Sequence, residues 1–352
     1  MHTNPEVFFM HHARSVLFGA LMLVMAVSAV GLALPHRVAA GETQPIKVLV
    51  STFPVYQFTR NITAGSTLLQ VDLMIPAQLG CPHDYALTPQ DMHKLGEAQI
   101  FIINGLGLEE FLGAPLQKAN PALQVIDSSK GIKEILNYGD EYGDAAAREE
   151  DDHHDGHTHD HDHDDHAEEA HAQHGHDSGP NPHIFASPRM AALQVDNIAK
   201  ALAEAAPAEK ELFTKNAQAY AQKLTALDKE FQQLGKRLAK TRIVTQHGVF
   251  DYLARDMGLE IVAVIAAHPG QDPSAAEALH LVQAIQAKKA GAIFTEPQYP
   301  DSIAQTIARE SGIPLAVLDP VANGPGQQAP LDYYQSTMRT NLKTLADTLG
   351  TK

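Results

Sequence analysis

One apolar stripe near the middle of the chain limits most strongly what this sequence can fold into. Between residues 208 and 240, aromatic and aliphatic residues recur at steps of three and four: Tyr220, Leu224, Leu227, Phe231, Leu234 and Leu238. This spacing predicts one amphipathic helix of roughly thirty residues, about 45 Å long at 1.5 Å per residue. Strand-like segments lie on both sides of it, so we expect the helix to bridge two parts of the molecule.

The strand-like segments are apolar runs separated by helical connections. IKVLV, QVDLMI and AQIFIING precede the long helix, and RIVTQH, EIVAVI, AGAIFTE and IPLAVLD follow it. Alternation of this kind predicts parallel sheets covered by helices. We therefore expect an α/β protein with two (β/α) lobes joined by a long, rigid backbone helix.

A stretch of different character, DDHHDGHTHDHDHDDHAEEAHAQHGH, occupies residues 151–176. It carries almost no apolar residue and cannot offset the entropy of ordering it, so we expect a disordered loop at about 140–178. Neutral imidazoles at short spacing, flanked by acids, suit many weak sites for borderline metals. A solvated acidic linker is the alternative, but it would not need the histidines. The predicted weak metal sites are His153, His154, His157, His159, His161, His163, His166, His171, His174 and His176.

The same stretch dominates the charge of the chain. Residues 140–177 hold fifteen Asp and Glu against one Arg, a local net of −14 out of −16 for all 352 residues. The remainder is nearly neutral and lacks the clustered basic stripe of a nucleic-acid surface. We expect no nucleic-acid partner and a monomer.

The first forty residues have the pattern of a secretory signal. An uncharged run at 15–34 is followed by Val38 and Ala40 at the small-residue positions of a signal-peptidase site. We expect cleavage between Ala40 and Gly41 and a periplasmic protein. A retained membrane anchor is the alternative, because the run is about long enough to span a bilayer. Cys81 is the only cysteine, so we expect no acylated cysteine at the cleavage site and no intramolecular disulfide.

Three histidines outside the acidic loop stand at strand or loop ends. His83 follows VDLMIPA, His183 lies in GPNPHIFASP, and His247 ends the apolar run IVTQH. A lone histidine in such a place is most often a capping or packing residue. Three together are a better candidate site, because loops at the carboxyl ends of strands are where α/β folds gather ligands.

Five segments, taken in order, resemble the successive motifs of the zinc-binding receptors of ABC transporters, the ZnuA-like branch of the cluster A-I metal-binding receptor family. They are VDLMIPAQLGCPHDYALTPQDMHKLGEAQIFIINGLGLEEFL, NPHIFASP, IVTQHGVFDYLARDMGLEIVAV, AIFTEPQYPDSIAQTIARESGIPLAVLDPV and YYQSTMRTNLKTLADTL. The similarity spans roughly residues 46–350. It implies two (β/α) lobes joined by a backbone helix, one metal ion in the cleft between them, and often a His-rich acidic loop at this same point.

Carried over residue by residue, the resemblance implies that His83, His183 and His247 are metal ligands and that Asp319 is the acidic ligand. Three imidazoles with one carboxylate or water satisfy the four-ligand demand of Zn²⁺. The manganese-binding relatives carry an acid where this chain has His247, and added imidazole favours zinc, so we expect Zn²⁺ as the transported ligand. Glu296 and water are the alternatives for the fourth position.

The chain departs from the family pattern in two places. It reads CPH where relatives commonly have an acid before the first histidine, and IFASP where they often have Trp-Leu-Asp-Pro. Neither change touches an implied ligand. A Cys81 thiolate ligand is conceivable, although Pro82 stiffens the turn between it and His83.

The expected function is a high-affinity receptor that captures Zn²⁺ in the periplasm and delivers it to a membrane permease, with the His-rich loop as an auxiliary zinc-collecting or sensing segment. A zinc hydrolase and a surface adhesin are the alternatives. No HExxH or GxSxG motif is present, and an adhesin would lack an evident means of retention, so we expect no enzyme and no adhesin.

The expected division of the chain follows from these segments. It comprises a signal peptide at 1–40, an N-terminal lobe at 41–200 that contains the loop, a linking helix at 201–240, and a C-terminal lobe at 241–352.

Overall fold

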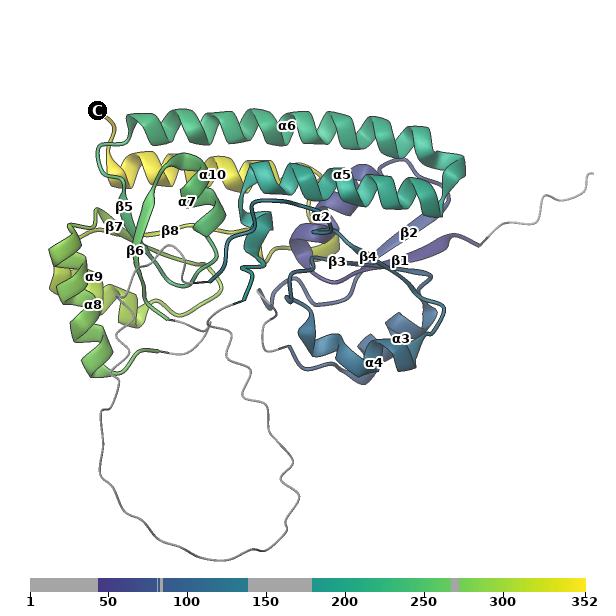
Figure 1. Ribbon diagram of the computed structural model, residues 1–352, viewed down its shortest axis with the longest axis horizontal. Helices are drawn as coiled ribbons and strands as arrows, with labels where there is room; N and C mark the ends of the chain where they lie inside the picture. Colours follow the sequence, from purple (N-terminus) through teal and green to yellow (C-terminus); the bar gives the residue numbers. More distant parts are fainter. Residues whose placement is uncertain (1–43, 81, 83–84, 139–178, 267–271) are drawn as a thin grey trace, which may run out of the picture. The chain divides into compact units, whose positions relative to one another are not determined.

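The computed structural model describes residues 44–80, 82, 85–138, 179–266 and 272–352. Residues 45–352 form one compact unit that contains two parallel sheets (Figure 1). No helix of this described part is both long enough and apolar enough to cross a membrane.

The first sheet has the strand order β2-β1-β3-β4, with every neighbouring pair parallel. Val48 and Val50 of β1 pack into the large core beside α2 and α5, whereas Leu49 faces a smaller core beside α3 and α4. Both faces of the sheet are therefore covered, as a buried parallel sheet requires. The elements of this N-lobe are β1 (Ile46–Val50), α2 (Phe53–Ile62), β2 (Leu69–Leu73), α3 (Pro89–Glu97), β3 (Ile100–Ile103), α4 (Gly113–Ala119) and β4 (Gln124–Asp127).

The second sheet repeats this arrangement with the order β6-β5-β7-β8, again all parallel. Ile243 of β5 faces the large core, and Val244 faces a second core together with Ile293 of β7. The elements of this C-lobe are β5 (Arg242–Thr245), α7 (Asp251–Met257), β6 (Glu260–Val264), α8 (Ala275–Lys288), β7 (Ala292–Thr295), α9 (Ser302–Ser311), β8 (Leu315–Val317) and α10 (Tyr333–Leu349).

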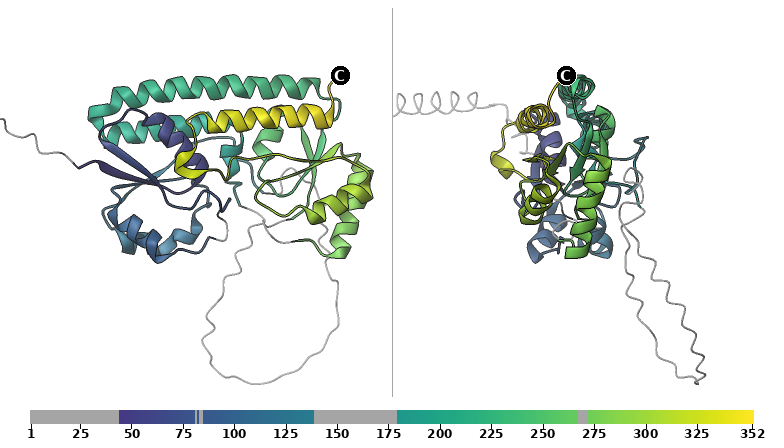
Figure 2. Two further views of the ribbon diagram at one scale, coloured as in Figure 1. Left: turned by 180° about the vertical axis from the view of Figure 1, so that it is seen from behind. Right: turned by 90° about the vertical axis from the view of Figure 1, so that its left-hand side faces the viewer.

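Two helices connect the sheets: α5 (Pro188–Ala205) and α6 (Lys210–Arg237), separated by a short 3-10 turn. Helix α6 has 28 residues and buries the predicted stripe from Tyr220 to Leu234. It packs against α2 and α5 of the first half and against α7 and α10 of the second, and Figures 1 and 2 show α10 running beside it. The prediction of two α/β lobes with a long connecting helix is confirmed, while the predicted domain limits stay a prediction.

Local signals in the sequence explain where several helices begin and end. The Thr88 hydroxyl accepts a hydrogen bond from the amide of Asp91, and the Asp91 carboxylate accepts one from the amide of Thr88, so α3 starts with a capping box. Ser274 and Glu277 start α8 in the same way. Gly258 closes α7 in the left-handed conformation that glycine adopts without strain.

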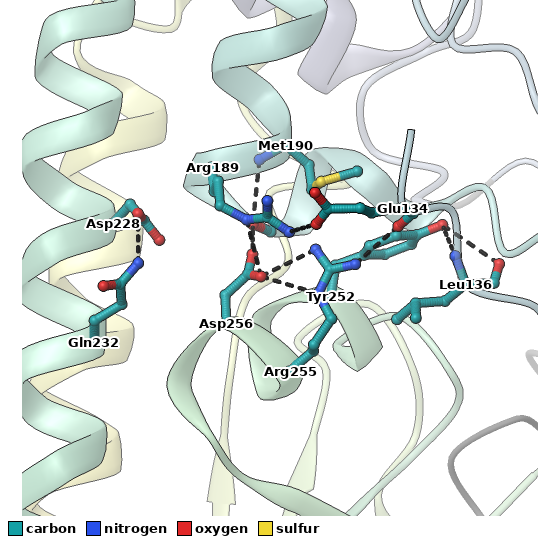
Figure 3. Close-up of polar contacts among 10 residues, drawn as sticks. Glu134, Leu136, Arg189, Met190, Asp228, Gln232, Tyr252, Arg255 and Asp256 are labelled. Carbon is teal, nitrogen blue, oxygen red and sulfur yellow. Dashed lines mark hydrogen bonds and ion pairs between the residues drawn. The ribbon is translucent and has the colours of Figure 1, made fainter. Parts of the chain in front are cut away.

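A polar cluster around Asp256 joins the start of α5 to α7 (Figure 3). The Asp256 carboxylate accepts hydrogen bonds from the Ser187 hydroxyl at 2.5 Å and from Nε of Arg189 and of Arg255 at 3.0 Å each. Arg189 also donates to Glu134 at 3.0 Å, and Arg255 donates to the Glu134 carbonyl at 2.8 Å. The Asp256 side chain is almost fully buried, where such charge-assisted bonds are strong, so the cluster fixes α5 against α7.

Helix α6 and the end of α7 lie close together at Gly235. A Cβ atom added there would lie 2.0 Å from the carbonyl oxygen of Met257, far inside van der Waals contact. Any larger side chain must therefore move one helix away from the other.

We predict that Gly235→Ala destabilises the protein, by about 1–3 kcal/mol, because overpacking against backbone cannot be relieved by a rotamer change. Gly96→Ala is the matched control, since Gly96 is also helical but an added Cβ there meets only the Ala119 carbonyl, at 3.8 Å. The control should be neutral or stabilising by up to about 1 kcal/mol. Urea unfolding monitored by circular dichroism measures both changes. Equal effects of the two substitutions would contradict the close approach.

Candidate functional site

The second sheet brings three predicted site residues to one edge. His247 lies two residues beyond the end of β5, Glu296 directly follows β7, and Asp319 lies two residues beyond β8. These three strands are neighbours in a parallel sheet, so their carboxyl ends meet at the same edge. The pattern of strand followed by short loop therefore places an imidazole and two carboxylates at the same edge of the sheet.

His247 and Glu296 are in direct contact, each with only 2 % of its surface exposed. Nδ1 of His247 touches Oε1 of Glu296, but the contact lacks the alignment of a hydrogen bond. Both ring nitrogens of His247 and Oε1 of Glu296 are left without a hydrogen-bond partner in the described part of the chain. The other oxygen of Glu296 accepts a hydrogen bond from the Gln298 amide at 2.7 Å. The arrangement leaves Nε2 of His247 as a buried ligand-type atom that has no hydrogen-bond partner among the described residues.

His183 enters the site from the loop that precedes α5. It starts a 3-10 turn, His183–Ala186, and is fully buried. Its ring lies edge-to-face with that of His247, with ring centroids 5.2 Å apart at 77°. Nδ1 of His183 lies 2.8 Å from Oδ1 of Asn181 and 3.4 Å from the Tyr138 hydroxyl. The two predicted histidine ligands therefore come together from segments far apart in the sequence.

Glu109, a buried glutamate in the turn after β3, helps to hold the backbone that contacts the His183 loop. Glu109 accepts hydrogen bonds from the Ser51 hydroxyl at 2.6 Å and from the backbone amides of Asn104 and Gly105 at 2.7 and 3.1 Å. Burial raises the pKa of Glu109 to about 7, although these donors act in the opposite direction. The Asn104 side chain in turn donates to the Pro182 carbonyl at 2.9 Å. The turn after β3 is thus bonded to the residue that precedes His183.

Asp319 is partly buried, and its carboxylate accepts a hydrogen bond from the amide of Val321 at 2.7 Å. Burial raises the pKa of Asp319 to about 6, opposed by that hydrogen bond and assisted by the negative charge of Glu296. The Asp319 carboxylate thus lies within electrostatic range of a second carboxylate, and a cation close to both would be stabilised by their negative charges.

The other predicted ligands lie outside the described residues. These are His83, Cys81 and the ten histidines of the acidic loop. Within the described ranges, no three His, Cys, Asp or Glu side chains converge closely enough to hold a metal ion by themselves. The four-ligand set of His83, His183, His247 and Asp319 therefore stays a prediction.

Three residues that touch the two histidines were not expected from the sequence. Asn181 and Tyr138 contact His183, and the Tyr299 ring packs edge-to-face on His247 with centroids 5.8 Å apart. Asn181 stands two residues before His183 in NPH, and that proximity was the only available signal. A surface hollow between α5 and α6, lined by Asp196, Lys200 and Lys210 among others, contains none of the predicted ligands.

The chain is similar in sequence to known zinc-binding and zinc-uptake proteins. The chain is 31 % identical over 304 residues to the zinc-binding lipoprotein AdcA of Streptococcus pneumoniae, which covers 86 % of this chain and 56 % of that protein. It is 28 % identical over 340 residues to the high-affinity zinc uptake system protein ZnuA of Bacillus subtilis, covering 96 % and 98 %. The chain thus spans little more than half the length of AdcA but nearly all of that ZnuA.

Solved structures show the same fold. A crystal structure of ZnuA matches with a TM-score of 0.67 and 25 % identity, covering 87 % of this chain and all of that one. Zn(II)-bound AdcA from Streptococcus pneumoniae matches with a TM-score of 0.66 and 26 % identity, covering 88 % and 59 %. A zinc-bound ZnuA lacking its residues 138–173 matches with a TM-score of 0.67 and 25 % identity, covering 88 % and all of that chain.

The family model for the periplasmic component A of the zinc-uptake complex, ZnuA, matches residues 48–348. That family consists of substrate-binding receptors of transport systems and not of enzymes, as the sequence predicted. Because this match covers most of the chain, the resemblance seen in the sequence is confirmed, and the chain belongs to the ZnuA family of zinc-uptake receptors.

Proposed function

We propose that this protein captures Zn²⁺ outside the cytoplasm and delivers it to the membrane permease of an ABC transporter. In this proposal His83, His183, His247 and Asp319 bind the ion, which is the cargo and not a resident cofactor. Zinc-bound structures of similar proteins and the names of the relatives support zinc as the ligand.

The observation that carries the proposal is the buried imidazole of His247. Among the residues that the structure describes, Nε2 has no hydrogen-bond partner and Nδ1 lies against the Glu296 carboxylate without forming a hydrogen bond, although His247 is 2 % exposed. A buried polar group without a partner costs about 1–3 kcal/mol, so a protein retains one only for a reason. A zinc ion that accepts the lone pair of a neutral imidazole would satisfy it.

The contact between His247 and Glu296 bears on the identity of the fourth ligand. A histidine that binds a metal usually directs its other ring nitrogen to a carboxylate, which orients the ring. Nδ1 of His247 lies against Glu296, so we assign Glu296 to orienting His247 and retain Asp319 as the acidic ligand. Two alternatives remain for the fourth position, Glu296 as a direct ligand and a water molecule. Zinc titration of variants at the two acidic residues tests them.

We further propose that the acidic loop supplies weak auxiliary sites that raise the zinc concentration near the tight site. The described residues on its two sides are bonded neighbours: the amide of Tyr138 donates to the Gly179 carbonyl at 3.0 Å, and that of Asn181 to the Leu136 carbonyl at 2.7 Å. A chain rejoined between these residues keeps this stem intact, so the loop can be deleted without moving the site.

The family is extracytoplasmic, and the finer placement is part of the proposal. We propose a monomer in the periplasm, released by cleavage between Ala40 and Gly41. These two residues lie outside the described ranges.

Zinc titration against a competing chelator tests the ligands. Single replacement of His83, His183 or His247 by Ala should weaken tight binding at least tenfold, because each removes one of four bonds in a closed shell. His280→Ala is the matched control, since His280 is exposed on α8. A loss of comparable size in the control would overturn the ligand set.

The same titration separates the two acids. Asp319→Asn should weaken zinc binding more than Glu296→Gln, because Asp319 is the proposed ligand whereas Glu296 is proposed only to orient His247. The reverse order would make Glu296 the ligand.

Without zinc, the ionised Asp319 carboxylate should lower the free energy of unfolding of the protein. Its pKa lies above the unfolded value, so ionisation disfavours the folded state, and this cost is fully present above about pH 6. In EDTA at pH 7.5, Asp319→Asn should therefore raise Tm by about 2 °C, equivalent to roughly 1 kcal/mol. At pH 4 the gain should largely disappear, because the carboxyl is then protonated in the folded protein. Differential scanning calorimetry measures both, and an equal gain at the two pH values would exclude ionisation as the cause.

Growth tests the transport role and the loop together. A strain lacking the protein should grow poorly only when zinc is scarce and should recover with added zinc but not with manganese. A copy lacking residues 151–176 should rescue growth at moderate zinc and lag under the tightest chelation. Full rescue at every chelator level would remove the proposed role of the loop, and normal zinc accumulation in the strain without the protein would contradict the receptor.

A further inference from the structure

We infer that Asn181 is a positioning residue: it fixes the tautomer of His183 and fastens the His183 loop to the His247 loop. The consequence for binding rests on the proposed function, whereas the effect on the tautomer does not require zinc. Asn181 is fully buried and belongs to none of the predicted ligand sets.

The orientation of the Asn181 amide is determined by two acceptors in the C-lobe. Its Nδ2 donates to the Gly248 carbonyl at 2.8 Å and to the Asp251 carboxylate at 2.7 Å. An amide nitrogen only donates, and both partners accept. The opposite orientation would place oxygen against two oxygens, so Oδ1 must face the other way, toward His183.

Oδ1 of Asn181 makes two contacts with His183. It lies 3.0 Å from the backbone amide and 2.8 Å from Nδ1 of the ring. Because Oδ1 can only accept, Nδ1 must carry the proton, and the lone pair of the neutral ring is then on Nε2. The Tyr138 hydroxyl lies farther from Nδ1, at 3.4 Å, so it does not decide the tautomer. Coordination of zinc through Nε2 is thereby set before the ion arrives.

The same amide relates His183 to His247. Gly248 directly follows His247, and Asp251 is the first residue of α7. The Tyr252 hydroxyl also donates to the Asn181 carbonyl, at 2.7 Å. Asn181 is therefore bonded to both loops and holds the two imidazoles in their edge-to-face arrangement. This preorganisation lowers the entropy cost of ordering the two loops when zinc binds.

Asn104 provides a matched control in the same region. It is also a fully buried asparagine, and its side chain donates to the Pro182 carbonyl, next to His183. It anchors the loop backbone but does not touch the imidazole. Asn104→Ala therefore reports the effect of loosening the loop, and Asn181→Ala reports that effect plus loss of the imidazole contact.

The test combines two measurements on the full mature protein. Long-range ¹H–¹⁵N spectra in EDTA report which nitrogen of His183 is protonated, and chelator competition reports zinc affinity. Wild-type protein should show the Nδ1-protonated form of His183. Asn181→Ala should mix the tautomers and weaken zinc binding by about 10–100-fold, whereas Asn104→Ala should keep the tautomer and the affinity within about threefold. Circular dichroism verifies that each variant is folded.

Exchanging the side chains of Asn181 and Asp251 provides a second test if Asn181→Ala does not fold. Asn181→Asp still accepts from His183 but places a carboxylate against Asp251, so binding should weaken. Adding Asp251→Asn restores an amide–carboxylate pair with reversed polarity and should recover part of that loss, the remainder reflecting the lost donor to the Gly248 carbonyl, a coupling that independent effects would not produce.

The inference is overturned if His183 in the wild-type protein is protonated on Nε2. It is also overturned if Asn181→Ala leaves tautomer and affinity unchanged, if Asn104→Ala has the same effect, or if the double variant gains nothing. Failure of the wild-type protein to bind zinc tightly would instead overturn the proposed function, and the spectra of the apo protein would still decide the tautomer.

Discussion

The packing of α6 is the constraint on which the rest of the structure depends. Its apolar stripe lies in one continuous core that also includes Val48 of the first sheet and Ile243 of the second. Helices α2, α5, α7 and α10 would otherwise expose the sides that they turn toward α6. Because the two sheets share this core, a rotation of one lobe against the other would expose apolar surface at a cost of about 25 cal/mol per Å². The spacing between His183 and His247 is therefore set by the interior of the protein, and adjustments on binding are expected in loops.

Patterns that depend on burial alone were read correctly from the sequence. The apolar runs at β1, β3, β5 and β7 are buried on both faces, and the three- and four-residue steps of α6 coincide with its buried side. Strand β4 was not foreseen, because it is an edge strand of four residues in which only Ile126 is buried. The expected linking helix at 201–240 ran across the break between α5 and α6, although the amphipathic pattern itself was placed after Pro207, at 208–240.

For the site, the sequence located side chains but not their relationships. His183 and His247 stood out because of their positions at strand and loop ends, and the structure places their rings together. That Glu296 lies against His247 follows from the pairing of β5 with β7, which spacing along the chain does not reveal. Asn181 was missed for the same reason, because its partners Gly248 and Asp251 come from a loop and helix some seventy residues away. Contacts across sequence distance of this kind are properties of the fold.

The stem formed by Tyr138 and Gly179 has a consequence for engineering. A hydrogen-bonded bridge at the surface of a compact unit is a position at which foreign sequence can be inserted, since closing a longer loop costs only about 0.6 kcal/mol for each doubling of its length. The stem is also two residues from Asn181 and in contact with His183 through Tyr138. A pair of fluorescent domains grafted at this point would be attached directly to the segment that carries one proposed ligand, which makes it a suitable position for a genetically encoded zinc reporter.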